Sequence, residues 1–374
     1  MSRPPEVPRL NYRALEGTNT KTRRLAYLTA ILKMVKSDAV GERSLLIRLT
    51  RWSQQHRKEL QSYWVQTGEV SSTRRNSAGA RYLHLATQLG LIVSVAGAYR
   101  VTRRGRVLLA LLEPHPINAN PFFLNPAERL YYTHLLLERD ADAFLTVTDR
   151  LLNQPGVSLA WLQKTFQADF LYRLGQKIAS SSDEKLRQEL LQRQVEVRGW
   201  TKPERYAEHL VPPRLNWLLD LGFLDPDRFK IHHYELTAGG KQFLTTLLHP
   251  SDDGFSDVTD EWLSSAFWEV AVEKLLDLHS LLEWDAVDEA SLQNVLGDLL
   301  RDTFQVFRHT FVPKVAFTQA LAYMSCRLIL EHRIRVSPAR LRKWFASPQV
   351  LNGRRYEVRF SPRENESYLL ATAV

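Results

Sequence analysis

The sequence predicts a mainly helical α+β protein, with two copies of one structural unit and a C-terminal helical domain that ends in a short β hairpin. Three observations support this prediction. Two stretches about 130 residues apart carry the same residue pattern, which is typical of a duplicated unit. Within each stretch, apolar residues occur first at helical and then at strand-like spacing. Near the C-terminus, Asn352-Gly353 separates two strand-like runs, as in a two-residue hairpin.

The repeated pattern is a leucine-rich helix, a Leu-Gly pair, a strand-like stretch and a Tyr-x-[Val/Leu]-Thr-x-x-Gly block. The pair and the block occupy residues 89–90 and 99–105 in the first copy, and residues 221–222 and 234–240 in the second. The second copy has three more residues between its glycine and its threonine. We therefore expect the same elements in both copies, with a longer connection in the second.

The elements of the first copy follow from local patterns. Apolar residues at helical spacing predict a helix over 77–89, and Gly90 is suited to the left-handed residue that ends it. A tight hairpin is expected over 91–101, because strand-like runs flank Ala96-Gly97-Ala98. Thr102 is a suitable N-cap for a further helix over 103–112.

This order of helix, glycine, hairpin and helix resembles the second half of a winged-helix domain. The resemblance covers residues 21–113 and 155–250. In that family the helix before the hairpin is the recognition helix and the hairpin is the wing, so the resemblance implies modules that bind duplex DNA or, in some members, protein. In the second copy, Pro212-Pro213 is expected to begin the recognition helix and residues 225–235 to form a longer wing.

Composition shifts divide the rest of the chain. Prolines and small polar residues indicate a flexible arm at the start, and four prolines indicate a linker after the first module. The expected divisions are a flexible arm over 1–20, a basic winged-helix domain over 21–113, a Pro-rich linker over 114–126, a helical segment with the second module over 127–250, and an acidic helical and then basic C-terminal domain over 251–374.

Charge is distributed unevenly, although the net charge is only +9. Residues 1–113 hold 20 Lys and Arg against 7 Asp and Glu, residues 249–302 hold 2 against 14, and residues 303–374 hold 12 against 4. The single cysteine excludes an internal disulfide, and no apolar run suggests a membrane span. We expect a cytoplasmic, nucleoid-associated protein without a membrane partner.

Cations concentrate on the elements that a winged helix presents to DNA, and basic residues surround aromatic ones near the C-terminus. The expected contacts are to phosphates and guanine edges. The candidate nucleic-acid-binding residues are Arg74, Arg75, Asn76, Arg81, Arg100, Arg103, Arg104, Arg106, Arg340, Arg342 and Lys343.

Protein partners are expected for the remaining parts. The second recognition helix carries only Arg214 as a cation, which favours a protein-binding role for this copy. Tryptophan is enriched at interface hot spots, so Trp262, Trp268 and Trp284 are candidate partner-binding residues. Residues 250–374 are expected to mediate docking to other subunits or self-association, or to pair their acidic and basic segments internally.

Motifs for catalysis are absent from the sequence. Neither a Gly-rich phosphate loop nor a nucleophile elbow occurs. The pair His232-His233 is a poor metal site, since adjacent strand residues point to opposite faces. We expect no catalytic residues, no cofactor and no metal.

These observations favour a non-catalytic duplex DNA-binding subunit of a larger prokaryotic DNA-processing or phage-defence assembly. Two alternatives remain open. One is a transcription regulator or a DNA-binding protein like a replication initiator. The other is an adaptor that bridges ATPase subunits.

Overall fold

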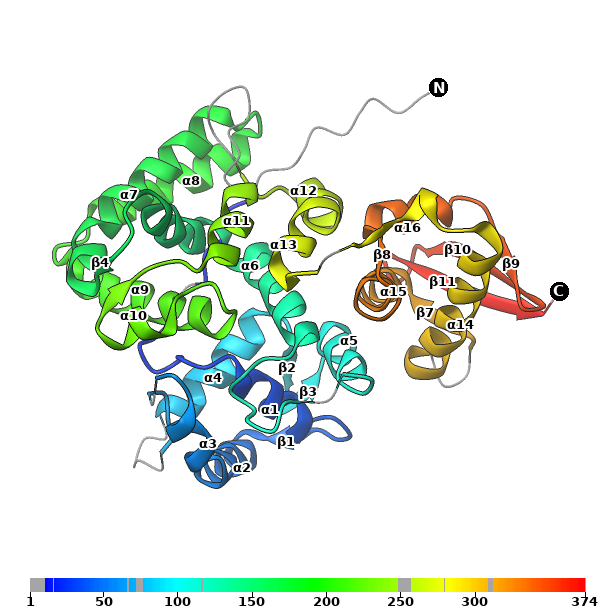
Figure 1. Cartoon of the computed structure of the whole chain (residues 1–374), viewed down its shortest axis with the longest axis horizontal. Coiled ribbons are helices and arrows are strands. Elements are labelled where there is room, and N and C mark those ends of the chain that lie inside the picture. The colour runs from blue at the N-terminus through cyan, green and yellow to red at the C-terminus, as the bar shows by residue number, and fades with distance from the viewer. Residues whose placement is uncertain are drawn as a thin grey trace.

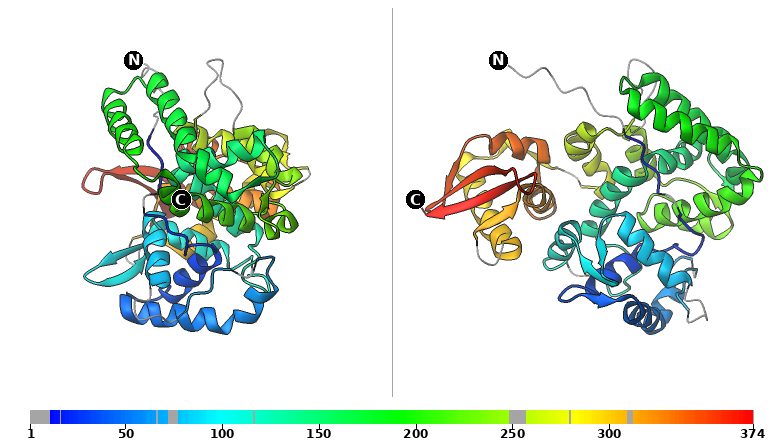
Figure 2. Two further views of the ribbon diagram at one scale, coloured as in Figure 1. Left: turned by 90° about the vertical axis from the view of Figure 1, so that its left-hand side faces the viewer. Right: turned by 180° about the vertical axis from the view of Figure 1, so that it is seen from behind.

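The computed structural model describes residues 11–15, 17–65, 67–71, 77–115, 117–247, 257–278, 280–308 and 312–373. Over these ranges the protein is mainly helical and has small sheets, which agrees with the expected mainly helical α+β class (Figure 1). The described elements form three units. The third lies to one side of the other two in Figure 1 and in the right view of Figure 2.

The first unit is a helical bundle with a three-stranded antiparallel sheet of order β1-β3-β2. In the sheet Val40 pairs with Tyr99. Ala96 and Gly97, both with positive φ, form the two-residue turn between β2 and β3, as expected. The elements are α1 (Ala26–Met34), β1 (Val40–Gly41), α2 (Glu42–Gln55), α3 (Arg57–Ser62), α4 (Ser77–Gln88), β2 (Ile92–Val95), β3 (Ala98–Val101) and α5 (Arg103–Leu111).

The second unit repeats this order of elements, and the repeat extends back to residue 126. Val157 pairs with Tyr234 as Val40 pairs with Tyr99, and Leu224 bridges to Leu236 at the position of the first pair of β2 and β3. The elements are α6 (Pro126–Asn153), β4 (Val157–Ser158), α7 (Leu159–Ser180), α8 (Glu184–Arg198), α9 (Pro203–Asp220), α10 (Pro226–Lys230), β5 (His233–Tyr234) and α11 (Ala238–Leu247).

Hydrogen bonds at the repeated motif also match. Gly90 and Gly222 both have positive φ, and their N–H groups donate to Thr87 O and Leu219 O at 2.9 Å. The hydroxyl of Thr102 donates to Gly90 O at 2.6 Å and accepts from the backbone N–H three residues later. The hydroxyl of Thr237 makes the equivalent bonds. The motif therefore ties the end of one helix to the start of the next in both copies.

Two expectations for the second copy are wrong. Residues 226–230 form the short helix α10 where a longer wing was expected. Pro212 and Pro213 lie inside α9, which continues through them from Pro203 to Asp220. The carbonyl of His209, to which residue 213 would donate if it had an N–H, instead accepts from the Thr18 hydroxyl at 3.0 Å. This contact compensates for one of the lost helical hydrogen bonds.

After residue 256 the chain first packs on the second unit. The elements α12 (Asp260–Ser264), a π-helix (Phe267–Ala271) and α13 (Val272–Leu276) lie against α6 and α11. These elements therefore pack on the second unit, whereas the elements from β6 onward form the third unit. The segment expected as one domain over 251–374 is thus divided between two units.

The third unit combines two long helices with a four-stranded antiparallel sheet of order β7-β11-β10-β9. A short parallel pair joins β6, at the start of the unit, to β8, which follows α15. Its elements are β6 (Leu282–Glu283), a 3-10 turn (Trp284–Ala286), α14 (Glu289–Phe307), β7 (Lys314–Ala316), α15 (Phe317–His332), β8 (Ile334–Arg335), α16 (Pro338–Trp344), β9 (Gln349–Leu351), β10 (Arg354–Ser361) and β11 (Glu366–Ala373).

This unit corrects the expectation of a helical domain with a short terminal hairpin. Asn352 and Gly353 do form the expected two-residue turn with positive φ. The sheet is larger, however, because β10 and β11 have eight residues each and β7 pairs with β11. As in the first unit, the second strand of a hairpin pairs with an earlier strand, here β11 with β7, but the third unit also has β8 and β9, which have no counterpart in the first unit.

A strap at the start of the described chain joins the first two units. Arg13 is buried, its N–H donates to the Asp142 carboxylate at 2.7 Å, and its guanidinium donates to Glu138 O at 2.6 Å. Leu15 N–H donates to Asp140 at 2.8 Å. Residues 11–15 and 17–20 lack helix and strand, yet these contacts make them part of the core, so the flexible arm expected over 1–20 is wrong for them. Residues 1–10 lie outside the described ranges.

The segment expected as a linker is also anchored. The described residues around 117–125 contain no helix or strand, but Phe122 is buried against Tyr27, Trp52 and Tyr63. Asn125 then caps α6 in a capping box with Glu128. The first two units are therefore held in a defined arrangement.

Candidate nucleic-acid interface

The helix α4 of the first unit presents a polar face to solvent. Tyr82, Leu83 and the other apolar residues of the helix are buried, whereas Arg81, His84 and Thr87 are exposed at three-residue spacing. This is the face of the expected recognition helix. Arg74, Arg75 and Asn76, also expected to contact DNA, lie outside the described residues.

The hairpin β2–β3 adds a second exposed surface. Val93 pairs with Arg100 across the two strands, and Val95 pairs with Ala98, so these side chains share one face of the hairpin. Val93, Val95 and Arg100 are exposed. The hairpin thus exposes one cation and the methyl groups of two valines on one face.

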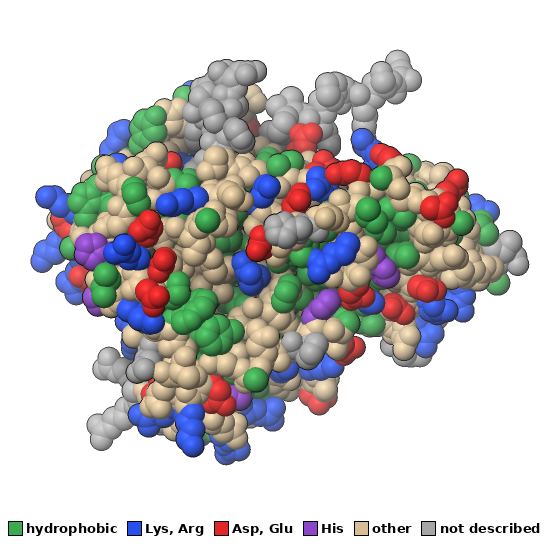
Figure 3. All heavy atoms as spheres, in the orientation of Figure 1, with side chains coloured by type: hydrophobic (Ala, Val, Ile, Leu, Met, Phe, Trp, Pro, Cys, Tyr) green, Lys and Arg blue, Asp and Glu red, His purple; other side chains and the backbone are tan. Residues whose placement is uncertain are grey.

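Further cations lie on α2 and α3. In Figure 3, Lys and Arg side chains gather along the lower edge of the molecule, where these helices lie. Much of the positive charge of the first unit is therefore exposed on α2 and α3. The exposed cations of these helices are Arg43, Arg48, Arg51, Arg57 and Lys58.

Two of the three arginines of α5 are paired with acidic residues of other units, whereas Arg106 is exposed. Arg103 forms an ion pair with Glu366 and donates to Tyr368 Oη at 3.2 Å. Arg104 forms an ion pair with Glu138 at 2.7 Å. The helix packs on α6 and α15, and the ion pairs of Arg103 and Arg104 lie at the junction between the units.

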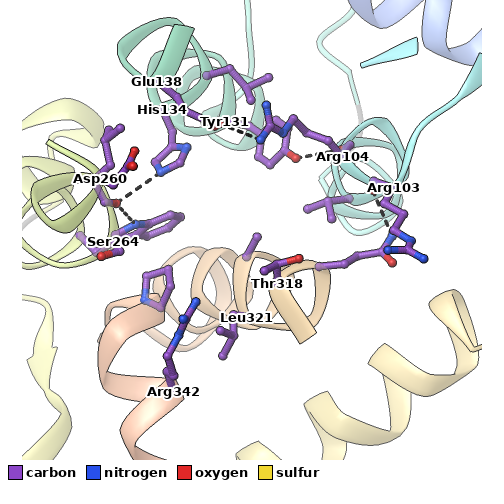
Figure 4. A pocket seen from close by; sticks show the side chains of 17 residues that line it. Arg103, Arg104, Tyr131, His134, Glu138, Asp260, Ser264, Thr318, Leu321 and Arg342 are labelled. Atoms are coloured by element: carbon purple, nitrogen blue, oxygen red, sulfur yellow. Dashed lines mark hydrogen bonds and ion pairs between the residues drawn. The ribbon is translucent and has the colours of Figure 1, made fainter. Parts of the chain in front are cut away.

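A cavity of about 530 Å³ lies at this junction, between α5, α6, α12, α15 and α16. Figure 4 shows Arg103 and Arg104 entering it from α5 and Arg342 entering it from α16. Residues expected to bind nucleic acid in two distant parts of the sequence therefore meet here. Glu138 and Asp260 also line the cavity, so its charge is mixed.

His134 of α6 lines the same cavity and packs against Phe267 and Trp268. Its surroundings remove it from bulk water, and this desolvation lowers the pKa of the imidazole, because the charged ring loses hydration. Its Nε2 lies 3.3 Å from Leu263 O. His134 is therefore neutral near pH 7 and stabilises the packing of α12 and the π-helix on α6.

The expected recognition helix of the second copy is not available to DNA or to another protein. Trp217 and Arg214 of α9 are fully buried. Trp217 Nε1 donates to Thr22 O at 2.8 Å, and Arg214 Nε donates to Asp140 at 2.8 Å. The C-terminal half of α9 binds the strap and the first unit, so the partner of this helix is its own chain.

The acidic and basic segments near the C-terminus pair internally. Arg335 forms ion pairs with Glu273 and with Glu283, the latter at 2.9 Å, and Arg340 forms one with Asp285. Arg340 is thus partly covered by an acidic residue. Lys343 of α16 is exposed and has no ion pair in the part of the chain that the structure describes.

The three candidate tryptophans occupy different environments. Trp268 is only 3% exposed and donates to Leu263 O, so it is a core residue and offers no surface to a partner. Trp262 and Trp284 are partly buried, and Trp284 packs on Trp344 of α16. The sequence alone did not distinguish the core tryptophan from the partly buried ones, because all three lie in one apolar stretch.

Two findings bear on other expectations. Within the described ranges, no group of three or more His, Cys, Asp or Glu side chains has an arrangement that would hold a metal ion. No described helix has both the length and the apolar character needed to cross a bilayer.

Comparisons with known proteins returned no match: no family model, no curated protein and no solved structure is similar to this chain.

Proposed function

We propose that this protein is a non-catalytic duplex DNA-binding subunit of a larger assembly, and that the first unit is a winged helix that makes the principal contact. The observation that carries the proposal is the combination of topology and exposed charge in that unit. A helix with an exposed Arg81-His84 face precedes a hairpin that exposes Arg100, within a three-stranded sheet of order β1-β3-β2.

The charges of the first unit support this role. A duplex carries closely spaced phosphates, and binding releases counterions in proportion to the cations that contact them. The exposed arginines of α2 lie on the same unit as α4 and the hairpin. Recognition by α4 would place Arg81 in the major groove and Arg100 along the flanking backbone.

The second unit supports a structural role for its own copy of the motif. The C-terminal half of its α9 is buried against the strap and the first unit, and its wing position is occupied by α10, so it holds the first unit in place. Exposed apolar side chains elsewhere on this unit support a place in a larger assembly, because such side chains are characteristic of partner-binding surfaces. These side chains are Tyr172 of α7 and Leu191 and Val195 of α8.

A salt-dependent binding experiment on the full chain tests the DNA contact. The variant Arg81→Ala/Arg100→Ala should bind a short labelled duplex more weakly. The slope of log affinity against log salt should fall by about 2 if both cations contact phosphates, and by less if Arg81 reads a base.

The matched control removes two exposed cations of the second unit that form no ion pair with a described residue, as Lys185→Ala/Arg205→Ala. It should leave both the affinity and the slope close to those of the wild type. Equal losses in the two double variants would mean that binding depends only on net charge, and the assignment to the first unit would then be wrong.

A further inference from the structure

A second cavity lies between the first and third units, on the other side of the contact between α5 and α15. It has a volume of about 310 Å³. Arg103 and Arg106 enter it from α5, Arg308 from the end of α14 and Lys314 from β7, and Tyr368 of β11 lines its wall. Four cations from segments about 200 residues apart in the sequence thus converge on one small space.

Two of these cations are neutralised by carboxylates. Arg103 forms an ion pair with Glu366, and Lys314 forms one with Glu364 at 3.3 Å. The ring of Tyr368 orients both, since its centroid lies 5.7 Å from Arg103 Cζ and 4.2 Å from Lys314 Nζ.

The other two cations are uncompensated. Arg106 and Arg308 are exposed, and neither has an ion pair or a side-chain hydrogen bond with any described residue. Two uncompensated positive charges at one cavity make its electrostatic potential positive, and the two charges repel each other. An anion bound between them would relieve this repulsion and would bridge the two units.

The chemistry of the side chains selects the anion. A guanidinium group is a planar fork of donors that matches the oxygens of a phosphate, and two such groups can bind one phosphate from two sides. Carboxylates line both cavities: Glu138 and Asp260 line the cavity between α5, α6 and α16, and Glu364 lines the smaller one. The smaller cavity is more suitable, because two of its cations, Arg106 and Arg308, form no ion pair with a described residue.

We propose that the cavity between α5 and β7 binds a phosphate group through Arg106 and Arg308, and that the bound phosphate fixes the third unit against the first. The phosphate comes either from the backbone of a nucleic acid or from a free phosphate compound. In its nucleic-acid form the site extends the proposed function to a second contact, whereas the free-phosphate form is independent of it.

The test uses the full chain and two probes, pyrophosphate and a short labelled duplex. In wild-type protein and in Lys185→Ala/Arg205→Ala, pyrophosphate should raise the melting temperature in a saturable manner relative to NaCl of equal ionic strength. The variant Arg106→Ala/Arg308→Ala should lose this response. It should also bind the duplex with a salt slope lower by about 2 than that of the control variant.

The two measurements distinguish the sources. Loss of the pyrophosphate response alone supports a free phosphate compound, and loss of duplex affinity alone supports a nucleic-acid backbone. Loss of both supports a site that accepts either. If neither measurement differs between Arg106→Ala/Arg308→Ala and the control, or if wild-type protein responds to neither probe, the proposal is overturned.

Failure of this proposal is separable from failure of the proposed function. Arg81→Ala/Arg100→Ala should retain the full pyrophosphate response, because both residues lie outside the cavity. If that variant also retains wild-type duplex binding, only the role of the first unit is wrong.

Discussion

At the scale of single residues, the structure explains why the repeated block ends in glycine, Gly105 in the first copy and Gly240 in the second. A Cβ at Gly105 would lie 2.2 Å from Leu91 O, and one at Gly240 would lie 2.5 Å from Phe223 O. Both distances are well inside van der Waals contact, and the obstacle is backbone that cannot rotate away. Glycine is required here for close packing of a helix on the preceding strand.

Replacing one of these glycines should destabilise the protein. Gly105→Ala forces α5 away from β2, and we expect a loss of about 1–3 kcal/mol in the free energy of unfolding, measured by denaturant titration. Gly41→Ala is the control, because a Cβ at Gly41 meets no heavy atom within 4 Å. Equal stability of the two variants would contradict the close approach.

His134 makes stability depend on pH. Burial lowers the pKa of its imidazole in the folded protein, so the unfolded chain binds a proton at a higher pH than the folded chain does. The stability that neutral His134 contributes is present at pH values above the pKa of histidine in the unfolded chain, about 6.5, and is lost as the pH falls below that pKa.

Comparing variants isolates this contribution. His134→Phe should lose less stability than the wild type between about pH 7 and pH 5. His209→Ala, which removes an exposed histidine, should follow the wild type. Thermal melting across this range is the measurement, and parallel curves for wild type and His134→Phe would contradict the assigned shift.

At the scale of elements, similar motifs lead to different roles because their surroundings differ. Both α4 and α9 end in a Leu-Gly pair and pack on the first helix of their own unit. The exposed face of α4 carries Arg81 and His84, whereas the corresponding residues of α9, Pro213 and Asn216, are buried. Asn216 accepts a hydrogen bond from Arg24 of the first unit at 2.8 Å, so this face of α9 docks internally.

The strap should stabilise α9 through a specific contact. Thr18→Val removes the hydroxyl that donates to His209 O, where Pro213 cannot donate. We expect a loss of about 1 kcal/mol in the free energy of unfolding. Thr245→Val, which removes an exposed hydroxyl bonded within α11, should cost less than half of that. Equal effects would show that the strap contact is unimportant.

At the scale of the whole molecule, a buried polar cluster joins the first two units. Arg24 and Asp220 are buried and form an ion pair at 2.6 Å. Arg24 also donates to Asn216 at 2.8 Å, and Asp220 accepts from Leu25 N–H at 2.7 Å and from Tyr63 Oη at 2.9 Å. Every partner crosses from one unit to the other, so the cluster fixes their relative orientation.

Breaking this cluster should be costly. Asp220→Ala leaves the Arg24 guanidinium buried without its counterion, and we expect a loss of about 3–5 kcal/mol in the free energy of unfolding. Asp298→Ala, which breaks an exposed pair with Arg301, should cost under about 1 kcal/mol. Replacing both buried partners, as Arg24→Met/Asp220→Leu, should recover part of the loss. A cost for Asp220→Ala as small as that of Asp298→Ala would contradict the role of the cluster.

The sequence by itself determined the local elements. Spacing of apolar residues, Thr102 and Thr237 as caps and the Asn352-Gly353 turn depend on neighbours along the chain, so the two copies and the turn between β9 and β10 were predictable. The DNA-binding role, the prokaryotic assembly and the association through residues 250–374 remain predictions.

Only the tertiary structure decided which surfaces are free. Arg81 and Arg103 are both exposed, yet Arg103 pairs with Glu366, more than 260 residues away, whereas Arg81 forms no ion pair with a described residue. Short strands such as β7 and β4 form because they pair with a strand that is distant in the sequence. A cavity likewise requires walls from several elements. Pairing and burial of this kind depend on contacts that close only when the units pack together, and no local pattern encodes them.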